Sequence, residues 1–226
     1  MPVFNEQASV RKVILEWFQE IENWTERFVF LAINDGSRDD TLKILQRLAE
    51  QLGPRFQIIS RANKGHGQSC LEGYHAACDR GIPWVLQIDS DGQCDPQYFF
   101  RLWRLREKAD VVYGYRFRRD DGWRRGLASV VLKTVLLVFA GVYCIDANVP
   151  YRLIRTDRLK AALVRMPQEF FLANVGLAVL LRREGWKEAV VPIRFRERYG
   201  GEPSVTLGKF GGKALELVRH LAALKD

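Results

Sequence analysis

Cysteine is scarce in this sequence of 226 residues, and the four that occur form no C-x-x-C pair. A small disulfide-stapled scaffold is therefore excluded, because such folds are short chains rich in cysteine. No charged and apolar leader precedes the first segment that reads as folded, so we expect a reducing, cytoplasmic setting. The four residues are Cys70, Cys78, Cys94 and Cys144.

Other absences narrow the function. The glycine and lysine spacing of a Walker loop does not occur, and no helix-turn-helix, zinc-finger or RNP-like pattern accompanies the basic residues. Nucleic acid is therefore not an expected partner. Apolar residues make up 47% of the chain and include six Trp, which excludes a disordered chain. At this length we expect one core with at most a small appendage.

Charge is divided unequally along the chain. Residues 1–95 hold 10 of the 35 Lys and Arg side chains and 14 of the 27 Asp and Glu side chains, a net charge of −4. Residues 96–226 hold the other 25 and 13 and carry +12, although the whole chain carries only +8. The second half is therefore suited to phosphates or to an anionic surface.

Apolar runs of strand length alternate with segments of helical periodicity in the first half of the chain. Apolar residues on one face predict helices around residues 10–21 and 42–52, the second capped by Asp39 or Asp40. This alternation indicates an α/β fold with a mainly parallel sheet flanked by helices, in which ligands bind beyond the carboxyl ends of the strands. The predicted strands are residues 28–33, 56–59, 84–88, 111–113 and 190–195, with Pro192 placing the last towards an edge.

Residues 1–6 look like the end of a strand that runs into the first helix, although almost no strand precedes them. Two interpretations are open. Either the sheet dispenses with most of its first strand, or residues before Met1 were lost when the start was assigned. We expect the second.

Two polar segments follow predicted strands. Residues 34–41 place Asp35 in a glycine turn, where its carboxylate can accept hydrogen bonds from a nucleobase or a ribose. Neighbouring polar residues are equally explained as helix caps. Residues 63–69 combine Lys64 with small residues at a helix start, an arrangement that suits phosphate.

The most informative segment is 89–96, which begins where an apolar strand ends. Asp89 and Asp91 would point to opposite sides of a regular strand, but in a turn both can face one hard cation. Such oxygen ligands suit Mg²⁺ or Mn²⁺, which bridge substrate phosphates. An EF-hand needs Glu at its twelfth position, which is Phe100 here, so calcium is not expected. A simple turn is the alternative interpretation.

Four of these blocks together resemble the family 2 glycosyltransferases, specifically the dolichol-phosphate mannose synthase-like, polyprenyl-phosphate branch. They occur in the family's order, and the resemblance covers residues 2–120 more closely than the rest of the chain. It implies a GT-A fold, a nucleotide-diphosphate sugar donor and Mg²⁺ or Mn²⁺. The four blocks are residues 2–6, 34–41, 63–67 and 89–93.

The resemblance implies a donor and metal half in residues 1–120 and an acceptor-binding, membrane-facing half in residues 121–226. Asp89, Asp91 and Gln93 are the implied metal ligands. The implied nucleotide contacts are Pro2, Phe4, Glu6, Asp35, Lys64, Gly65, Asp89 and Ser90. The expected acceptor or phosphate contacts are Arg116, Arg124, Arg125, Ser129, Arg198 and Ser204, and surface ion pairs are the alternative for the arginines.

Two apolar segments of the second half suggest contact with a membrane. Residues 127–145 contain one charged side chain, Lys133, and read as an interfacial helix, a core helix or a membrane span. The resemblance implies the interfacial helix. Residues 206–224 read as one amphipathic helix, compatible with a membrane surface or with core packing.

The chain departs from the family pattern in two places. Pro203 and Val205 flank Ser204, and many mannose-synthase-like members have Lys after that Ser, so the sugar and the acceptor stay open. No Glu-Asp pair is present to supply a general base, although Asp146 and Glu169 are candidates for that role. A lipid monophosphate is already ionised near neutral pH and needs little base, so the missing pair favours a phosphate acceptor.

The resulting hypothesis is a metal-dependent inverting glycosyltransferase that moves a hexose from a GDP- or UDP-sugar to a polyprenyl phosphate. We expect it to be peripheral on the cytoplasmic membrane face, with Asp89, Asp91 and Arg198 as catalytic residues. Two alternatives stay open. One is a transferase with a polysaccharide or soluble hydroxyl acceptor, and the other is a non-catalytic nucleotide-sugar-binding protein at the membrane.

Overall fold

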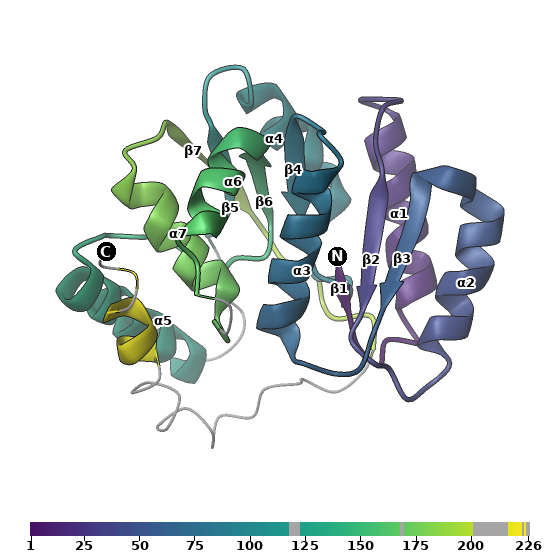
Figure 1. The fold of residues 1–226 in the computed structure, drawn as a ribbon, viewed down its shortest axis with the longest axis horizontal. Coiled ribbons are helices and arrows are strands. Elements are labelled where there is room, and N and C mark those ends of the chain that lie inside the picture. The colour runs from purple at the N-terminus through teal and green to yellow at the C-terminus, as the bar shows by residue number, and fades with distance from the viewer. Residues whose placement is uncertain (118–122, 168–169, 201–216, 223, 225–226) are drawn as a thin grey trace.

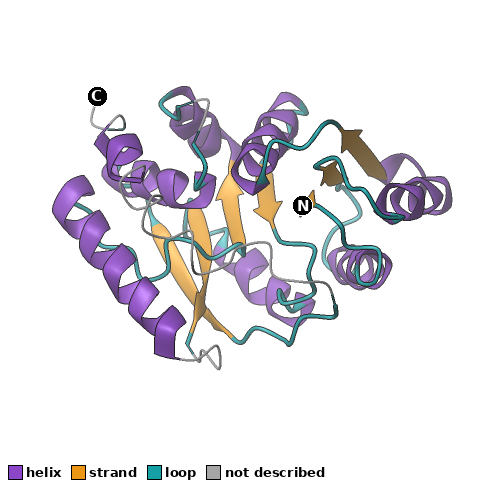
Figure 2. Ribbon diagram, turned by 90° about the horizontal axis from the view of Figure 1, so that it is seen from below, coloured by secondary structure: helices purple, strands orange, loops and turns teal. Residues whose placement is uncertain are grey.

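The computed structural model describes residues 1–117, 123–167, 170–200, 217–222 and 224, and of residues 123–128 the backbone alone. Helices surround the strands in Figure 1, and Figure 2 shows helices on both faces of the strands. The buried apolar residues form one cluster that extends from Val3 to Leu224. The described residues therefore share one core, as the chain length predicts.

The strands form two sheets. β1, β2 and β3 form a parallel sheet in that order, with bounds Pro2–Val3, Phe30–Asn34 and Phe56–Ser60. The other sheet has the order β4-β6-β5-β7, with bounds Trp84–Gln87 (β4), Val111–Arg116 (β5), Arg152–Arg155 (β6) and Glu188–Ile193 (β7). β6 is antiparallel to β4 and β5, whereas β5 and β7 are parallel. β7 is an edge strand, as Pro192 predicts.

The helices form where apolar residues recur at helical spacing. α1 buries the predicted face, and its Trp17 makes edge contacts with the rings of Phe99 and Tyr151. α7 is buried from Ala173 to Leu181, so it lies within the core. α3 contacts β1, β2 and β4 as well as α6 and α7. The helices are α1 (Val10–Glu22), α2 (Thr41–Leu52), α3 (His66–Asp79), α4 (Phe99–Leu105), α5 (Trp123–Val135), α6 (Thr156–Val164) and α7 (Ala173–Arg183).

Two features of the second sheet differ from the sequence prediction. β5 continues three residues beyond the predicted range 111–113, through Gly114 to Arg116. A Cβ atom on Gly114 would lie 2.4 Å from Cδ1 of Ile193 in β7, so glycine leaves room for that buried side chain. β6 was not predicted, because this short strand begins and ends with arginine.

The apolar run 127–145 does not form one helix. α5 continues into a π-helical segment, Leu136–Ala140, and the chain turns at Gly141, whose φ is 69°. None of the helices in the described part of the chain is sufficiently long and apolar to span a bilayer. Of the predicted helix 206–224, residues 217–222 are helical, and most of the rest lies outside the described residues.

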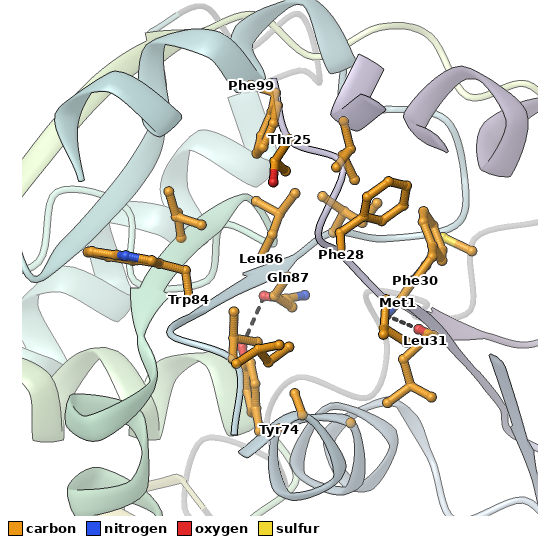
Figure 3. Close-up of a pocket in the computed structure, with 18 of the residues that line it drawn as sticks. Met1, Thr25, Phe28, Phe30, Leu31, Tyr74, Trp84, Leu86, Gln87 and Phe99 are labelled. Atoms are coloured by element: carbon orange, nitrogen blue, oxygen red, sulfur yellow. Dashed lines mark hydrogen bonds between the residues drawn. The ribbon is translucent and has the colours of Figure 1, made fainter. Parts of the chain in front are cut away.

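An apolar cavity of about 160 Å³ lies between β2 and β4 (Figure 3). It is bounded by Met1 just before the short strand β1, by Phe28 just before β2, by Leu31 in β2, and by Trp84 and Leu86 in β4. The Met1 ammonium group donates a hydrogen bond to the carbonyl oxygen of Leu31 at 2.9 Å. Burial lowers the pKa of this amino group to about 6. β1, which corresponds to the strand end predicted in residues 1–6, is two residues long.

Candidate active site

The predicted metal-binding segment forms a tight turn just after β4. Oδ1 of Asp89 accepts a hydrogen bond from Nε2 of Gln87 at 3.3 Å and lies 3.2 Å from Nε2 of His66 at the start of α3. Oδ1 of Asp91 accepts the backbone N–H of Gln93 at 3.0 Å. Between them, Gly92 has a φ of 83°, which favours glycine.

The turn places two carboxylates in a partly buried position. Burial, and after it the negative charge of Asp89, raises the pKa of Asp91. The side chains of Asp89 and Asp91 are 27% and 16% exposed, so both are accessible to a ligand from solvent. Like charges this close favour binding of a cation, which would relieve their repulsion.

Glu6 and Arg198 complete this carboxylate group from distant parts of the chain. Glu6 is buried and accepts hydrogen bonds from Oγ of Ser9, at 2.7 Å, and from the guanidinium of Arg198. Nη1 of Arg198 also lies 3.8 Å from Oδ2 of Asp91. Burial raises the pKa of Glu6, and the Ser9 hydroxyl and the Arg198 charge oppose that shift. Arg198 is therefore the shared counter-ion of Glu6 and Asp91.

The residues at the turn fit one hard divalent cation. No group of three or more His, Cys, Asp or Glu side chains in the described residues is arranged as a complete metal cage. Mg²⁺ needs less, because it keeps several waters and takes one or two carboxylates together with substrate phosphates. Asp89 and Asp91 would supply those two carboxylates. Gln93 supports the turn through its backbone, and its part as a ligand stays a prediction.

Asp35 lies at the end of β2, inside a ring of four hydrogen-bond donors. Its Oδ1 accepts the backbone N–H of Lys64 at 2.8 Å and a bond from the guanidinium of Arg61. Its Oδ2 accepts the backbone N–H of Gly65 at 2.9 Å and the side-chain amide of Asn63 at 3.2 Å. Both oxygens are thus saturated by the loop that opens α3, so a nucleobase would have to displace one of these donors.

We therefore expect that replacing Asp35 by Asn destabilises the fold by about 2–4 kcal/mol. Asn would turn one acceptor oxygen into a donor that faces N–H groups, and would leave the Arg61 charge with one carboxylate partner, Glu72. Urea unfolding measures the change. Asp40→Asn is the matched control, because Asp40 is an exposed carboxylate and should change the stability by less than about 0.5 kcal/mol. Equal stability of the two variants would contradict this account.

The predicted phosphate-binding residues are placed in different ways. Arg116 forms a two-point ion pair with Asp146, at 2.6 Å for both bonds, and lies over the ring of Phe195. In the alternative interpretation as surface ion pairs, Asp120 and Asp121 are the neighbouring acidic residues. Both lie outside the described residues, as do Ser204 and Glu169 and the side chains of Arg124 and Arg125.

The other predicted nucleotide-contacting residues line the same end of the sheet. Pro2 is buried in β1 and Phe4 is half-buried, whereas the side chain of Lys64 is exposed next to the α3 start. Ser90 is buried, and its carbonyl oxygen accepts a bond from Oγ of Ser9 at 3.4 Å. Ser129 is half-buried in α5, which Figure 1 shows well away from β1 to β3.

Three residues of the site were not predicted from the sequence. Arg61 holds Asp35, His66 lies beside Asp89, and Arg196 is bound to the segment that follows the Asp91 turn. His66 stands within the predicted block 63–69 but had been given no role. The two arginines carried no motif signal, because their partners are distant in sequence.

The chain also matches a protein-family model. The model of glycosyl transferase family 2 matches residues 1–152, more than half of the chain. The chain belongs to glycosyl transferase family 2. The resemblance predicted from the four sequence blocks is thereby confirmed, and the matched residues include both the Asp35 loop and the Asp89 turn.

The relatives of this family 2 chain include undecaprenyl-phosphate 4-deoxy-4-formamido-L-arabinose transferases. That of Pseudomonas syringae pv. syringae (strain B728a) is 34% identical over 134 residues, which are 58% of this chain and 39% of the relative. That of Edwardsiella ictaluri (strain 93-146) is 25% identical over 224 residues, which are 98% of this chain and 66% of the relative. The family 2 chain therefore spans less than two thirds of the length of these relatives.

Solved structures confirm the fold of the family 2 chain. Glucosyl-3-phosphoglycerate synthase from Mycobacterium tuberculosis, in complex with Mn²⁺, UDP and phosphoglyceric acid, matches with a TM-score of 0.70 and 16% identity. The match covers 99% of this chain and 76% of that one. Another structure of the M. tuberculosis synthase gives a TM-score of 0.68 at 15% identity, with 99% and 78% coverage. The expected GT-A architecture of a mainly parallel sheet with flanking helices is confirmed.

Proposed function

We propose that this family 2 chain is a glycosyltransferase that moves a sugar from a nucleotide-diphosphate donor to a polyprenyl phosphate, with Mg²⁺ or Mn²⁺. The observation that carries the proposal is the convergence of Asp89, Asp91, Glu6 and Arg198 just beyond the carboxyl ends of β1 and β4. The names of the relatives, undecaprenyl-phosphate sugar transferases, support the lipid-phosphate acceptor.

The chemistry assigned to each residue follows from charge. A bound divalent cation would stabilise the negative charge that develops on the leaving diphosphate. Asp89 and Asp91 would hold that cation. Arg198 neutralises Glu6 and Asp91 in the free chain and is within reach of a diphosphate bound beside them. When an anionic phosphate arrives, the guanidinium can exchange one anionic partner for another.

The proposed acceptor needs no general base. A lipid monophosphate is largely ionised at neutral pH, so its oxygen can attack the anomeric carbon directly. Asp146 is one of the two candidate general bases. Both of its carboxylate oxygens accept hydrogen bonds from Arg116. This pairing favours a structural role for Asp146 and supports the phosphate acceptor.

One assay tests the proposal directly. Purified protein is incubated with undecaprenyl phosphate in vesicles, labelled UDP- or GDP-sugars of the hexose and pentose classes, and either Mn²⁺ or EDTA. We expect metal-dependent label in the chloroform phase. Label that stays in the aqueous phase with a hydroxyl acceptor would favour the polysaccharide or soluble alternative. Nucleotide binding without any turnover would favour the non-catalytic protein.

The proposed membrane contact lies on α5 and the π-helical segment after it. The side chains of Val131, Leu137, Val138 and Phe139 are 52%, 54%, 68% and 43% exposed. Lys133 is half-buried in the last turn of α5, between Val131 and Leu137 in the sequence. An apolar surface beside a lysine suits an anionic lipid leaflet, in which the apolar groups insert and the ammonium group reaches the headgroups.

Replacing Val138 by Glu is therefore expected to weaken binding to anionic vesicles by about tenfold or more, because it exchanges an inserted apolar group for a charge that the leaflet repels. Val164→Glu is the matched control, since Val164 on α6 is 88% exposed and lies outside this surface. Vesicle co-sedimentation measures both variants. A similar loss of binding in the two variants would contradict the assignment of this surface.

A further inference from the structure

The segment that leaves β7 is tied to two distant parts of the fold by Arg196. Its Nη1 donates to Oε2 of Glu16 in α1 at 2.8 Å and to Oη of Tyr199 at 2.7 Å. Its Nη2 donates to Oδ1 of Asp95 at 2.5 Å. The Tyr199 hydroxyl in turn lies 3.1 Å from Oε2 of Glu16. We refer to Glu16, Asp95, Arg196 and Tyr199 as the Arg196 clasp.

The backbone of this segment is bound to the candidate metal turn. The N–H of Arg196 donates to the carbonyl oxygen of Gln93 at 3.0 Å, and the N–H of Tyr199 donates to that of Asp91 at 3.1 Å. The Tyr199 ring also covers Gly92, where an added Cβ would lie 2.5 Å from Cδ2 of the ring. The turn and the segment therefore pack as one unit.

Arg198 lies between the two tethered residues of this unit. Its guanidinium donates to the carbonyl oxygen of Gly200 at 2.7 Å and reaches Glu6 and Asp91. In the described part of the chain, the Arg196 side chain donates hydrogen bonds to Glu16 in α1, to Asp95 and to Tyr199, and to neither Asp89 nor Asp91. Arg196 thus acts on the site only through the residues that it holds.

The Arg196 clasp is partly exposed to solvent, which limits its contribution to the free energy of unfolding. The side chains of Arg196 and Glu16 are about one third exposed, and Asp95 is 8% exposed. Partly exposed ion pairs contribute little to the free energy of unfolding. A planar fork that binds three partners nevertheless fixes their relative positions, which a single ammonium group cannot do.

We propose that Arg196 is a positioning residue, which sets the place of Arg198 against the Asp89–Asp91 turn and thereby the affinity of the site for a divalent cation with a nucleoside diphosphate. This inference rests on the proposed function. Replacing a residue that orients metal ligands without binding the metal itself typically changes metal affinity by about 10- to 100-fold.

The test compares Arg196→Gln with Arg165→Gln. Arg165 forms an ion pair with Glu184, with side chains 36% and 35% exposed, so it matches Arg196 in exposure but lies on another part of the fold. Calorimetric titration with UDP and GDP in the presence of Mn²⁺ measures affinity, and amide hydrogen exchange reports the Tyr199 N–H. For Arg196→Gln we expect about tenfold weaker binding, faster exchange at Tyr199, and a melting temperature close to that of Arg165→Gln. Arg196→Lys should recover part of the affinity, because it keeps one of the charged contacts.

The outcomes separate this inference from the function on which it rests. If the unaltered chain binds the nucleotides with Mn²⁺ and Arg196→Gln binds them equally well, or if exchange at Tyr199 is unchanged, the positioning role is overturned. A common loss of affinity in both variants also overturns it. If the unaltered chain binds no nucleotide, the proposed function itself fails, while the exchange measurement still decides whether Arg196 holds the segment.

Discussion

Replacing Asp91 by Asn is expected to lower sugar transfer by about 10³-fold or more while the chain stays folded. The side chain keeps its shape and its acceptor oxygen for the Gln93 N–H, but it loses the charge that would hold a cation beside the diphosphate. Burial and Asp89 already disfavour this charge, since they raise the pKa of Asp91. Its removal should therefore leave the melting temperature unchanged or slightly higher.

The same assay should show an equivalent loss for Asp89→Asn, because both carboxylates face one cation in the proposed site. Asp157→Asn is the control, since Asp157 lies at the start of α6 and is 57% exposed. Initial rates are measured over a Mn²⁺ titration, so that weaker metal binding is separated from slower chemistry. Near-normal turnover in either purified site variant would refute the metal assignment.

Replacing Arg198 by Gln is expected to lower kcat by about 10²- to 10³-fold, with a smaller change in KM. The guanidinium is the described cation that contacts both Glu6 and Asp91, and the transition state gains negative charge in the same place. Arg165→Gln is again the exposed control. An equal loss in kcat for the two variants would remove Arg198 from the catalytic group.

The Arg198 variant should also depend differently on pH. Burial raises the pKa of Glu6, and Arg198 opposes that shift, so its removal should raise the pKa further. A carboxyl group whose pKa is higher in the folded state stabilises the fold while it is protonated, and this stability is lost as the pH rises through the folded pKa. The melting temperature of the variant should therefore fall increasingly below that of the unaltered chain as the pH rises above the acid range. Parallel curves would contradict the pairing of Arg198 with Glu6.

Much of the donor side of the site was predictable, because it consists of short polar blocks directly after apolar strands. β2 and β4 were predicted to within two residues at each end, and Asp35 and Asp89 follow the carboxyl ends of these two strands, as the rule for open α/β sheets predicts. The prediction did not extend to what surrounds each carboxylate. The four donors around Asp35 come from residues 61–65, and spacing along the chain does not reveal that they fold back on it.

The second half was less predictable for an identifiable reason. β6 begins with Arg152, a residue type that rarely lies in a core, yet its side chain is fully buried. Its guanidinium donates to the carbonyl oxygens of Ala147, Val149 and Asn174, which satisfy it without a carboxylate. A pattern of apolar residues cannot show such a solution. The Arg196 clasp was not predicted either, because Asp95 and Glu16 lie 101 and 180 residues away from Arg196 in the sequence.

The division of the strands into two sheets has a mechanical consequence. In the described residues no backbone ladder joins β1, β2 and β3 to β4, β5, β6 and β7, and an apolar cavity lies along part of this seam. The two sheets are consequently joined by α3, by the packing of Trp17 in α1 against Phe99 and Tyr151, and by side-chain hydrogen bonds such as Ser9 to Ser90 and Arg198 to Glu6. These hydrogen bonds lie where donor and cation would meet. A ligand bound there would contact residues that follow both sheets. Ligand binding would therefore also stabilise and rigidify the arrangement of the two sheets.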